Sequence, residues 1–412
     1  MSTAAQHEQM MSLARRALAH QQNKTTDQTD SVMSKPIETY TDESRYAAER
    51  ERVFKTLPLA LALTAELPNP GDYKTMDALD TPVLIARGDD GIARAFLNVC
   101  RHRGARVCES ESGNARHFAC PYHAWVYSRE GELTSRYGEK VFGEVNESEL
   151  GLSQLGCAES AGIIWVTLGS KEAFDPSVWL GGMKQQLESL HLEDWYIHET
   201  RELIGPGWKV TMDGYLEIYH HNSVHGATVG QHTIGNLLVL DTYGPHQRLT
   251  LARKTLSTLA DTPESEWEPL QHIRLVHNCY PNLSISGILG DHCLVSQIFP
   301  GPTPDTTRTI QTVLAAKQPN TDAEKEATQL FSDMVLQAVR DEDYHLGLLI
   351  QQGIKSGANH QFLYGKNEPA VQNYHNWTDY FMCHESGFDW SDQGELDESE
   401  ANQGVSDKSA AV

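Results

Sequence analysis

Short apolar runs separated by turn residues fill the first part of the chain, over residues 58–170. The runs at 81–87 (TPVLIAR) and 92–99 (IARAFLNV) flank the turn Gly-Asp-Asp-Gly, which predicts a β-hairpin. The run GIIWVTL at 162–168 has the pattern of a buried strand. We therefore interpret this part of the chain as a small all-β domain.

The pattern changes after Gly169, where helical and strand-like periods alternate over longer stretches. Residues 178–192 carry apolar side chains at helical spacing, and residues 323–354 have the spacing of a long helix that faces a core. Between them, residues 237–313 alternate in the manner of antiparallel strands. The chain also begins with a polar stretch that contains one amphipathic helix. The pattern as a whole predicts an α+β fold.

A chain of 412 residues exceeds the size at which one hydrophobic core usually keeps growing, so we expect two domains. The predicted boundaries are an N-terminal arm with a helix over 1–45, the β domain over 46–170 and the α+β domain over 171–388. Residues 389–412 form an acidic tail with almost no large apolar residues, which we expect to be disordered.

The composition excludes several classes of partner. A net charge of −23 argues against binding to nucleic acid or to an anionic membrane. No apolar run approaches the roughly 18 residues of a membrane span, and the start of the chain lacks the apolar core of a signal peptide. The seven cysteines form no disulfide framework. We therefore expect a cytoplasmic protein.

Two cysteine–histidine pairs form the most informative motif. Cys100 and His102 are separated by one residue, and Cys120 and His123 by two. This spacing is typical of a Rieske [2Fe–2S] centre, in which two cysteines hold one iron and two histidines hold the other. Zinc also binds sets of two cysteines and two histidines. Zinc pairs, however, usually join Cys with Cys and His with His, whereas both pairs here are mixed.

The surrounding sequence, NVCRHRGARVC at 98–108 and FACPYHAWVYSREGEL at 118–133, resembles the Rieske domain of Rieske non-heme iron oxygenases. Rieske proteins of respiratory complexes carry two further cysteines that join the cluster loops by a disulfide. Those positions are Ala105 and Tyr122 in this chain, so that bridge is absent. The resemblance therefore implies the oxygenase or ferredoxin branch of Rieske proteins, in which this β domain is the Rieske domain.

A second candidate metal site lies in the segment 208–225, which contains three histidines. Two histidines and one carboxylate suit a mononuclear non-heme Fe(II) that keeps open positions. On a regular helix His221 and His225 share a face, because they are four residues apart. His220 and His225 lie about 140° apart around the axis. They converge only if the helix breaks between them, and Asn222-Ser223 is a candidate for that break.

The family resemblance selects among these residues. Rieske oxygenases have the pattern Glu/Asp-x2-His-x4-5-His here, which matches Glu217, His220 and His225. It implies that His220 and His225 bind the iron, and that His221 is a packing histidine. The third ligand in the family comes from a downstream helix and matches Asp343. From the sequence alone, its neighbours Asp341 and Glu342 remain alternatives.

The same resemblance implies a role for Glu217 and an activity for the chain. The acid at this position in the family bridges an iron-ligand histidine to a Rieske histidine of the neighbouring subunit, here His220 and His123. The implied fold of 171–388 is a helix-grip sheet of the START or Bet v 1 type, in a homo-oligomer, commonly a trimer. The chain would be the terminal oxygenase component that hydroxylates or demethylates an apolar or aromatic small molecule with O2.

Partners follow from what the sequence lacks. No Gly-x-Gly-x-x-Gly motif opens a helix, so we expect electrons from a separate NAD(P)H-dependent reductase, with or without a ferredoxin. The alternative hypothesis is a Rieske electron-transfer protein or redox sensor without oxygenase activity. The set His220, His225 and Asp343 argues against that alternative, because an electron carrier has no use for a second iron site.

Overall fold

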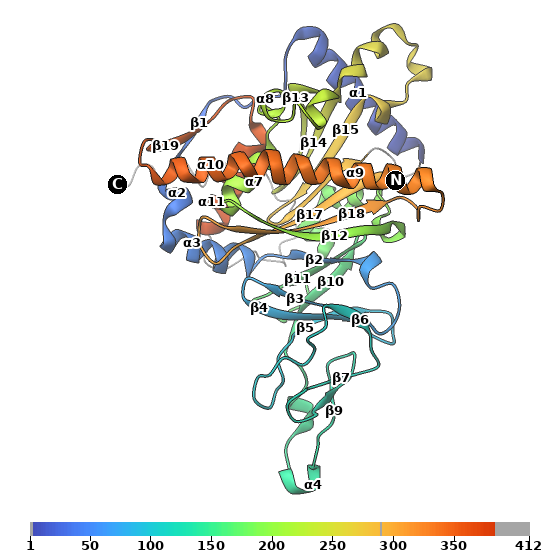
Figure 1. Ribbon diagram of the computed structural model, residues 1–412, viewed down its shortest axis with the longest axis vertical. Coiled ribbons are helices and arrows are strands. Elements are labelled where there is room, and N and C mark those ends of the chain that lie inside the picture. Colours follow the sequence, from blue (N-terminus) through green and yellow to red (C-terminus); the bar gives the residue numbers. More distant parts are fainter. Residues whose placement is uncertain (1–2, 289–290, 384–412) are drawn as a thin grey trace.

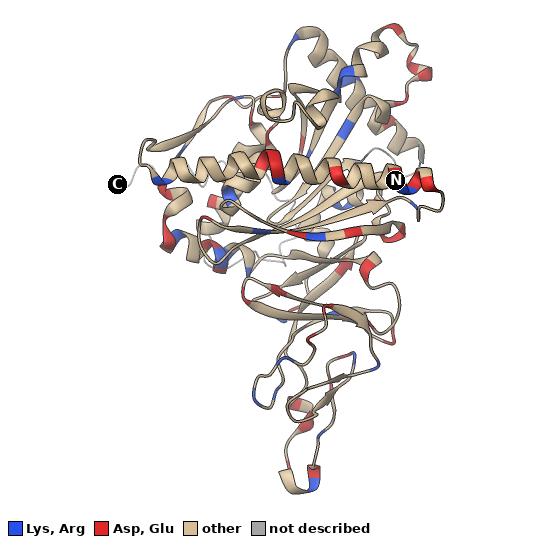
Figure 2. Cartoon of the chain, in the orientation of Figure 1, with Lys and Arg blue, Asp and Glu red and all other residues tan. Residues whose placement is uncertain are grey.

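The computed structural model describes residues 3–288 and 291–383 and has two parts, one above the other in Figure 1. The predicted acidic tail over 389–412 lies outside the described residues. No helix among the described residues has the length and apolar character needed to cross a bilayer. In the view of Figure 2, lysines and arginines are scattered among the more numerous acidic residues over both parts.

The β domain is built on a seven-stranded antiparallel sheet, in the order β2-β11-β10-β5-β4-β3-β6. The predicted hairpin is confirmed as β4 paired with β5, and the predicted buried strand as β11. A small three-stranded sheet, β7-β8-β9, extends from the far end (Figure 1). The strands are β2 (Leu59–Leu63), β3 (Asp72–Ala78), β4 (Thr81–Arg87), β5 (Ala93–Leu97), β6 (Ser112–Asn114), β7 (Phe118–Ala119), β8 (Val126–Tyr127), β9 (Leu133–Ser135), β10 (Gln154–Ser160) and β11 (Ile163–Thr167). One short helix, α4 (Glu139–Phe142), lies at the tip.

The second part contains another seven-stranded antiparallel sheet, in the order β12-β18-β17-β16-β15-β14-β13. Its strands confirm the strand-like alternation between residues 237 and 313. They are β12 (Tyr196–Gly205), β13 (Thr233–Tyr243), β14 (His246–Arg253), β15 (Ile273–Cys279), β16 (Leu283–Ile288), β17 (His292–Pro300) and β18 (Thr307–Ala315).

One long helical rod crosses this sheet (Figure 1). It consists of α9 (Asp322–Leu336), a π-helical segment η9 (Gln337–Asp343) and α10 (Tyr344–Lys355). The predicted long helix is thus present, with a π-helical insertion that the periodicity did not indicate. α9 packs on the sheet through Phe331 and Val335, which join sheet residues in one core cluster. Such insertions are frequent at functional sites.

The helix that carries the histidines breaks earlier than the sequence suggested. α7 (Trp208–Leu216) ends at Glu217, whose backbone is extended, and a separate one-turn helix α8 (His221–Val224) follows. The prediction of a break at Asn222-Ser223 is therefore wrong, since both residues lie inside α8. The Glu217 carboxylate accepts a hydrogen bond from the His220 backbone N–H at 3.0 Å. That bond gives the chain an alternative to continuing the helix.

The N-terminal segment packs against the second part rather than standing apart from it. The predicted helix is present as α1 (Thr3–Asn23), and its buried face, which includes Leu13, Ala14 and Ala17, packs on β13, β14 and β15. Further on, β1 (Met33–Pro36) pairs with β19 (Gln361–Tyr364). The remaining α-helices of the described residues are α2 (Glu38–Thr41), α3 (Glu43–Glu49), α5 (Pro176–Leu180), α6 (Gly182–Glu188) and α11 (Pro369–Cys383).

Asp213, on α7, ties this helix to the N-terminal segment and to α11. Its carboxylate accepts hydrogen bonds from the Tyr40 hydroxyl at 2.5 Å and pairs with His375 Nε2 at 2.8 Å. These contacts join three segments that are far apart in the sequence. They fix the position of α7, and therefore the point at which the chain turns toward the histidines.

Candidate functional site

Two loops at the far end of the β domain bring the four predicted cluster residues together. Cys100 and His102 follow β5, and Cys120 and His123 lie between β7 and β8. Both loops begin with the same turn, in which each cysteine carbonyl accepts a hydrogen bond from the backbone N–H four residues later, at 3.0 Å. The turns place Gly104 at a φ of 79° and thereby return the chain toward the sheet.

The side chains of these loops form two layers. Cys100 and Cys120 are buried, each with 3% of its surface exposed, whereas the histidines are only partly buried. The His102 and His123 rings lie edge to face, with an angle of 62° between their planes and their Nδ1 atoms 3.0 Å apart. Two imidazole nitrogens at this distance, next to two buried thiols, form a donor set that fits a two-iron cluster held by sulfur on one side and nitrogen on the other.

Neighbouring side chains stabilise this arrangement. The Trp125 ring stacks on His102, with centroids 5.0 Å apart and an angle of 7° between the planes. The Tyr127 hydroxyl lies 3.3 Å from Cys100 Sγ, and it also accepts a hydrogen bond from the Arg101 backbone N–H at 3.0 Å. Hydrogen bonds to cluster sulfurs are among the features that set the potential of an iron–sulfur centre.

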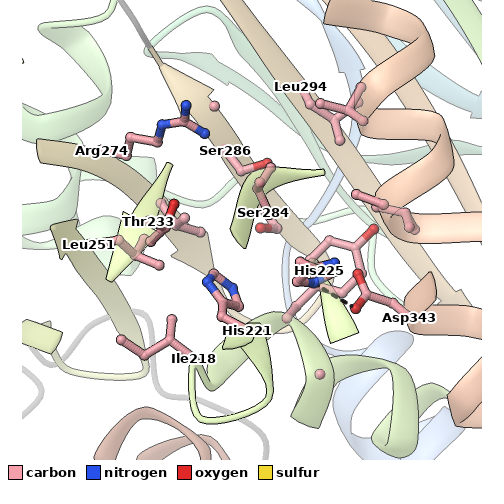
Figure 3. Close-up of a pocket in the computed structure, with 18 of the residues that line it drawn as sticks. Ile218, His221, His225, Thr233, Leu251, Arg274, Ser284, Ser286, Leu294 and Asp343 are labelled. Atoms are coloured by element: carbon pink, nitrogen blue, oxygen red, sulfur yellow. Dashed lines mark ion pairs between the residues drawn. The ribbon is translucent and has the colours of Figure 1, made fainter. Parts of the chain in front are cut away.

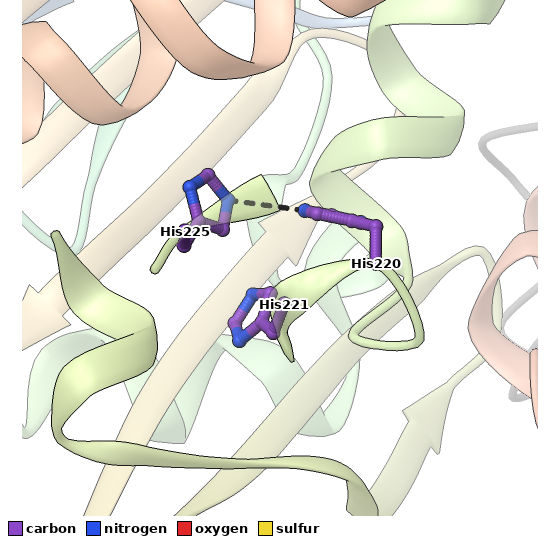
Figure 4. Close-up of side chains that lie close together, drawn as sticks. All are labelled: His220, His221 and His225. Atoms are coloured by element: carbon purple, nitrogen blue, oxygen red, sulfur yellow. Dashed lines mark hydrogen bonds between the residues drawn. The ribbon is translucent and has the colours of Figure 1, made fainter. Parts of the chain in front are cut away.

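A second group of donors lies between α8 and the long helical rod. His220 Nε2 and His225 Nε2 are 3.1 Å apart (Figure 4), and Asp343 Oδ1 lies 3.0 Å from His225 Nε2 and 3.5 Å from His220 Nε2. His220 and His225 converge because they cap opposite ends of the single turn α8. Three donor atoms from these residues thus face a common point, with the geometry that a two-histidine, one-carboxylate metal site requires.

The electric field at this point favours a cation. Burial alone disfavours the charged form of His220, but the nearby Asp343 and Glu217 carboxylates outweigh it and raise the pKa of His220 to about 10. Burial likewise opposes ionisation of Asp343, yet hydrogen bonds from His220 and His225 lower its pKa below the usual value. A metal ion would supply the positive charge that the imidazoles otherwise take up as protons.

Two carboxylates hold the outer nitrogens of the ligand imidazoles. Glu217 pairs with His220 Nδ1, and Glu342 Oε2 lies 2.6 Å from His225 Nδ1. The Thr228 hydroxyl donates to the same Glu342 oxygen at 2.5 Å. A carboxylate on the outer nitrogen fixes the tautomer of a ligand histidine and directs its Nε2 lone pair inward.

From the sequence, Glu342 was only an alternative to Asp343 as the third iron ligand. Adjacent residues of a regular helix point about 100° apart. In the π-helical segment, Glu342 and Asp343 instead reach opposite nitrogens of the same His225 ring. Asp341, the other alternative, is exposed and pairs with Arg340 at 2.6 Å. The sequence shows the acidic cluster, which could have pointed to Glu342. It does not show the π-helical segment, which turns the Glu342 side chain toward His225.

His221 is the third histidine of this cluster, and a set of His220, His221 and His225 would also be close enough to hold a metal ion. Its ring centroid lies 5.0 Å from that of His220 and 5.1 Å from that of His225 (Figure 4). His221 differs in that its buried Nδ1 has no hydrogen-bond partner in the described residues. Burial, followed by the charges of its two neighbours, lowers the pKa of His221 to about 3.

A cavity opens beside the three donors, and Figure 3 shows side chains that line it. His220, His221, His225 and Asp343 lie along one side of it. The opposite walls are mostly apolar and come from the face of the sheet and from α9. The apolar lining residues include Leu249, Leu251, Val276, Leu294, Phe331 and Val335. The site therefore combines a cation-binding point with a cavity for an organic molecule.

Comparison with known families assigns both parts of the chain. Residues 58–141 match the model of the Rieske [2Fe-2S] domain, and residues 188–384 match that of the ring hydroxylating alpha subunit (catalytic domain). The first match supports an iron–sulfur cluster over zinc at the four cysteine and histidine positions.

Curated relatives agree with these matches. The large subunit of anthranilate 1,2-dioxygenase from Burkholderia cepacia is 31% identical over 199 residues, which cover 46% of this chain and 47% of that protein. The oxygenase subunit of glycine betaine monooxygenase from Pseudomonas aeruginosa is 30% identical over 198 residues, which cover 48% of this chain and 46% of that protein. The chain thus spans about half the length of the curated relatives it matches.

Solved structures share the fold. The quaternary ammonium Rieske monooxygenase CntA superposes with a TM-score of 0.74 at 22% identity, over 85% of this chain and 96% of that chain. Naphthalene 1,2-dioxygenase from Rhodococcus sp. gives a TM-score of 0.71 at 19% identity, over 91% of this chain and 98% of that chain. The predicted fold class, an all-β Rieske domain ahead of a curled antiparallel sheet with helices, is confirmed.

The role of Glu342 can be tested by Glu342→Gln. The substitution keeps the shape of the side chain but removes the charge that orients His225, so we expect the affinity of the histidine site for Fe(II) to fall about 10- to 100-fold. The measurement is an anaerobic titration of the metal-depleted site with Fe(II). Asp341→Asn is the matched control, because Asp341 is exposed and should leave the affinity unchanged. Equal affinities for the two variants would contradict the role.

Proposed function

The chain belongs to the Rieske non-heme iron oxygenases with a ring-hydroxylating catalytic domain, and we propose from this membership that it is a terminal oxygenase component. Its cofactors are a [2Fe–2S] cluster and a mononuclear iron. The proposed cluster ligands are Cys100, His102, Cys120 and His123, and the proposed ligands of the single iron are His220, His225 and Asp343. The proposed reaction is hydroxylation or oxidative demethylation of a small organic molecule with O2.

One observation carries this proposal. Donor atoms of His220, His225 and Asp343 converge at the wall of an apolar cavity, in a chain that also carries a Rieske domain. A carrier or sensor of electrons would need the cluster without such a cavity. These three side chains would hold a mononuclear iron, which would supply the activation of O2.

The side chains around the site have defined tasks in this proposal. Glu217 and Glu342 hold the outer nitrogens of the ligand histidines, so that both Nε2 atoms keep their lone pairs directed at one point. The apolar walls bind the body of the substrate and exclude water from the reacting atoms. The chain thereby orients the substrate beside the donors before the reaction begins.

Electrons are proposed to cross between subunits. In Figure 1, the loops around β7 and β8 lie at the far end of the molecule from α7 and α8, so the two sites of one chain are well separated. Glu217 pairs with His220 and also lines a second pocket, which lies against α10 residues such as Leu346 and Ile350. In a ring of subunits, commonly a trimer in this family, its carboxylate would also bond a Rieske histidine of the neighbour, by position His123.

The electron donor is proposed to be a separate NAD(P)H-dependent reductase, directly or through a ferredoxin. The sequence has no Gly-x-Gly-x-x-Gly motif that opens a helix, and two-electron donors must be coupled to the single-electron steps of a Rieske cluster. The partners of the oxygenase are thus this reductase, O2, the organic substrate and further copies of the same chain.

Iron content tests the two-site proposal. We expect about three iron atoms per chain in the wild-type protein, two in the cluster and one at the triad. His220→Ala should lose one iron and all turnover while it keeps the visible spectrum of the Rieske cluster. His221→Ala serves as the matched control on the adjacent residue and should retain all three. Two iron atoms in the wild type would support an electron carrier instead.

The bridging role of Glu217 has its own test. Glu217→Gln should weaken Fe(II) binding as Glu342→Gln does, so the variant is first loaded with excess Fe(II). With both metal sites filled, it should still slow electron transfer from the reduced cluster by at least tenfold. The measurement is the rate of cluster reoxidation in a single turnover with O2 and substrate. A rate equal to that of the wild type would remove Glu217 from the electron path.

A further inference from the structure

The cavity beside the triad is small. It encloses about 140 Å³, close to the roughly 150 Å³ of an engineered apolar cavity that accepts benzene. Its apolar walls continue along β14, β15 and β17 through Leu251, Val276 and Leu294. A molecule with one ring, or an aliphatic body of equal size, fits this space better than a fused polycyclic one.

One side chain of the cavity carries a charge that pairs with no acidic group in the described part of the chain. Arg274, on β15, lines the cavity, and its buried Nε has no hydrogen-bond partner. No ion pair joins its guanidinium to an acidic residue among residues 3–288 and 291–383, in a chain with 56 acidic residues. By comparison, Arg248 on the neighbouring strand β14 pairs with Asp241 at 2.9 Å.

A second arginine adds to the positive charge near this end of the cavity. Arg253 lies two residues beyond Leu251 on β14 and therefore on the same face of the strand. Its buried Nε also lacks a partner in the described residues. Burial, followed by the charge of Arg253, lowers the pKa of Arg274 to about 10. Two neighbouring cations without a carboxylate are costly to bury, and an anion from outside would remove that cost.

The acidic groups of the cavity are already matched. Glu217 pairs with His220, and Asp343 lies 3.0 Å from His225 Nε2. Neither carboxylate is free to bind a cationic substrate group. The unmatched charge in the cavity is therefore positive, which favours an anionic substrate over a quaternary ammonium compound.

The polar atoms of the cavity are arranged along its length. In Figure 3, Arg274 lies across the view from Asp343, and His221, Ser284 and Ser286 lie between them. His221 Nδ1 and Ser284 Oγ are buried without partners in the described residues. A substrate that reaches from Arg274 to the triad would pass both atoms and could bond them with its own polar substituents.

We propose that the substrate is a ring-sized carboxylate, bound by the Arg274 guanidinium at the end of the cavity away from the triad. The planar guanidinium presents two parallel N–H groups, which match the two oxygens of a carboxylate. The apolar body then lies against Leu251, Val276 and Leu294, with the carbon to be oxidised beside His225 and Asp343. This inference rests on the proposed function and adds a substrate class to it.

Binding to the holoenzyme tests the inference without turnover. Isothermal titration under anaerobic conditions compares benzoate with benzamide, which has the same shape without the charge. We expect benzoate to bind at least tenfold more tightly. Arg274→Met should abolish this difference by weakening benzoate and leaving benzamide within about threefold, and Arg274→Lys should restore part of it. Arg308→Met is the matched control, since Arg308 on β18 pairs with Glu202 at 2.7 Å and should change neither affinity.

In the comparison of benzoate with benzamide, three outcomes would overturn the inference: no binding of benzoate, equal binding of the two compounds by the wild type, or an unchanged preference in Arg274→Met. If that variant does not fold, the wild-type comparison still decides. Tighter binding of glycine betaine than of benzoate would also overturn it, because the cavity offers no free acid for an ammonium group. Iron content of the same preparation separates this result from the proposed function, which fails only if the triad iron is absent.

Discussion

The histidine site depends on one constraint: three donor atoms from two distant segments must face a common point. His220 and His225 lie at the two ends of one helical turn, and Asp343 lies on the helical rod that crosses the sheet. Their Nε2 and Oδ1 atoms lie within 3.0 to 3.5 Å of one another. The carboxylates of Glu217 and Glu342 keep the two imidazoles in this orientation, because each pairs with the outer nitrogen of one ring.

Two departures from regular helix make this constraint possible. The extended backbone at Glu217 ends α7 and lets its carboxylate turn back toward His220. The π-helical segment lets adjacent acids reach the two nitrogens of the same His225 ring. The apolar cavity and the unmatched Arg274 then lie on the sheet side of these donors. The two interruptions of regular helix thus place the donor atoms next to the cavity in which the substrate is proposed to bind.

The features that were predictable from the sequence depend on local patterns. The hairpin of β4 and β5, the strands of the second sheet and the long helix follow from apolar periodicity alone. The paired spacing of Cys100 and His102 with Cys120 and His123 indicated a Rieske cluster, and the family model agrees. The choice of His220 over His221 required the resemblance, because regular helix geometry favours His221 with His225.

The remaining features depend on contacts between distant segments. The packing of α1 on the second sheet and the contact of Glu342 with His225 each join residues far apart in the sequence. The same holds for the lack of a hydrogen-bond partner at Arg274 Nε among the described residues. The break at Glu217 also escaped prediction, since it depends on a side chain that bonds the backbone three residues later. The apolar periodicity of a sequence does not show which charged side chain will lack a partner. The proposed substrate class depends on such a side chain, Arg274.

The central claim is that a single iron lies between His220, His225 and Asp343, in addition to the cluster. Anomalous diffraction at the iron edge, from crystals of the holoenzyme, tests it most directly. We expect one peak within bonding distance of His220 Nε2, His225 Nε2 and an Asp343 oxygen, separate from the peak at the cluster loops. A peak bonded to His221 in place of Asp343, or iron at the cluster loops alone, would contradict it.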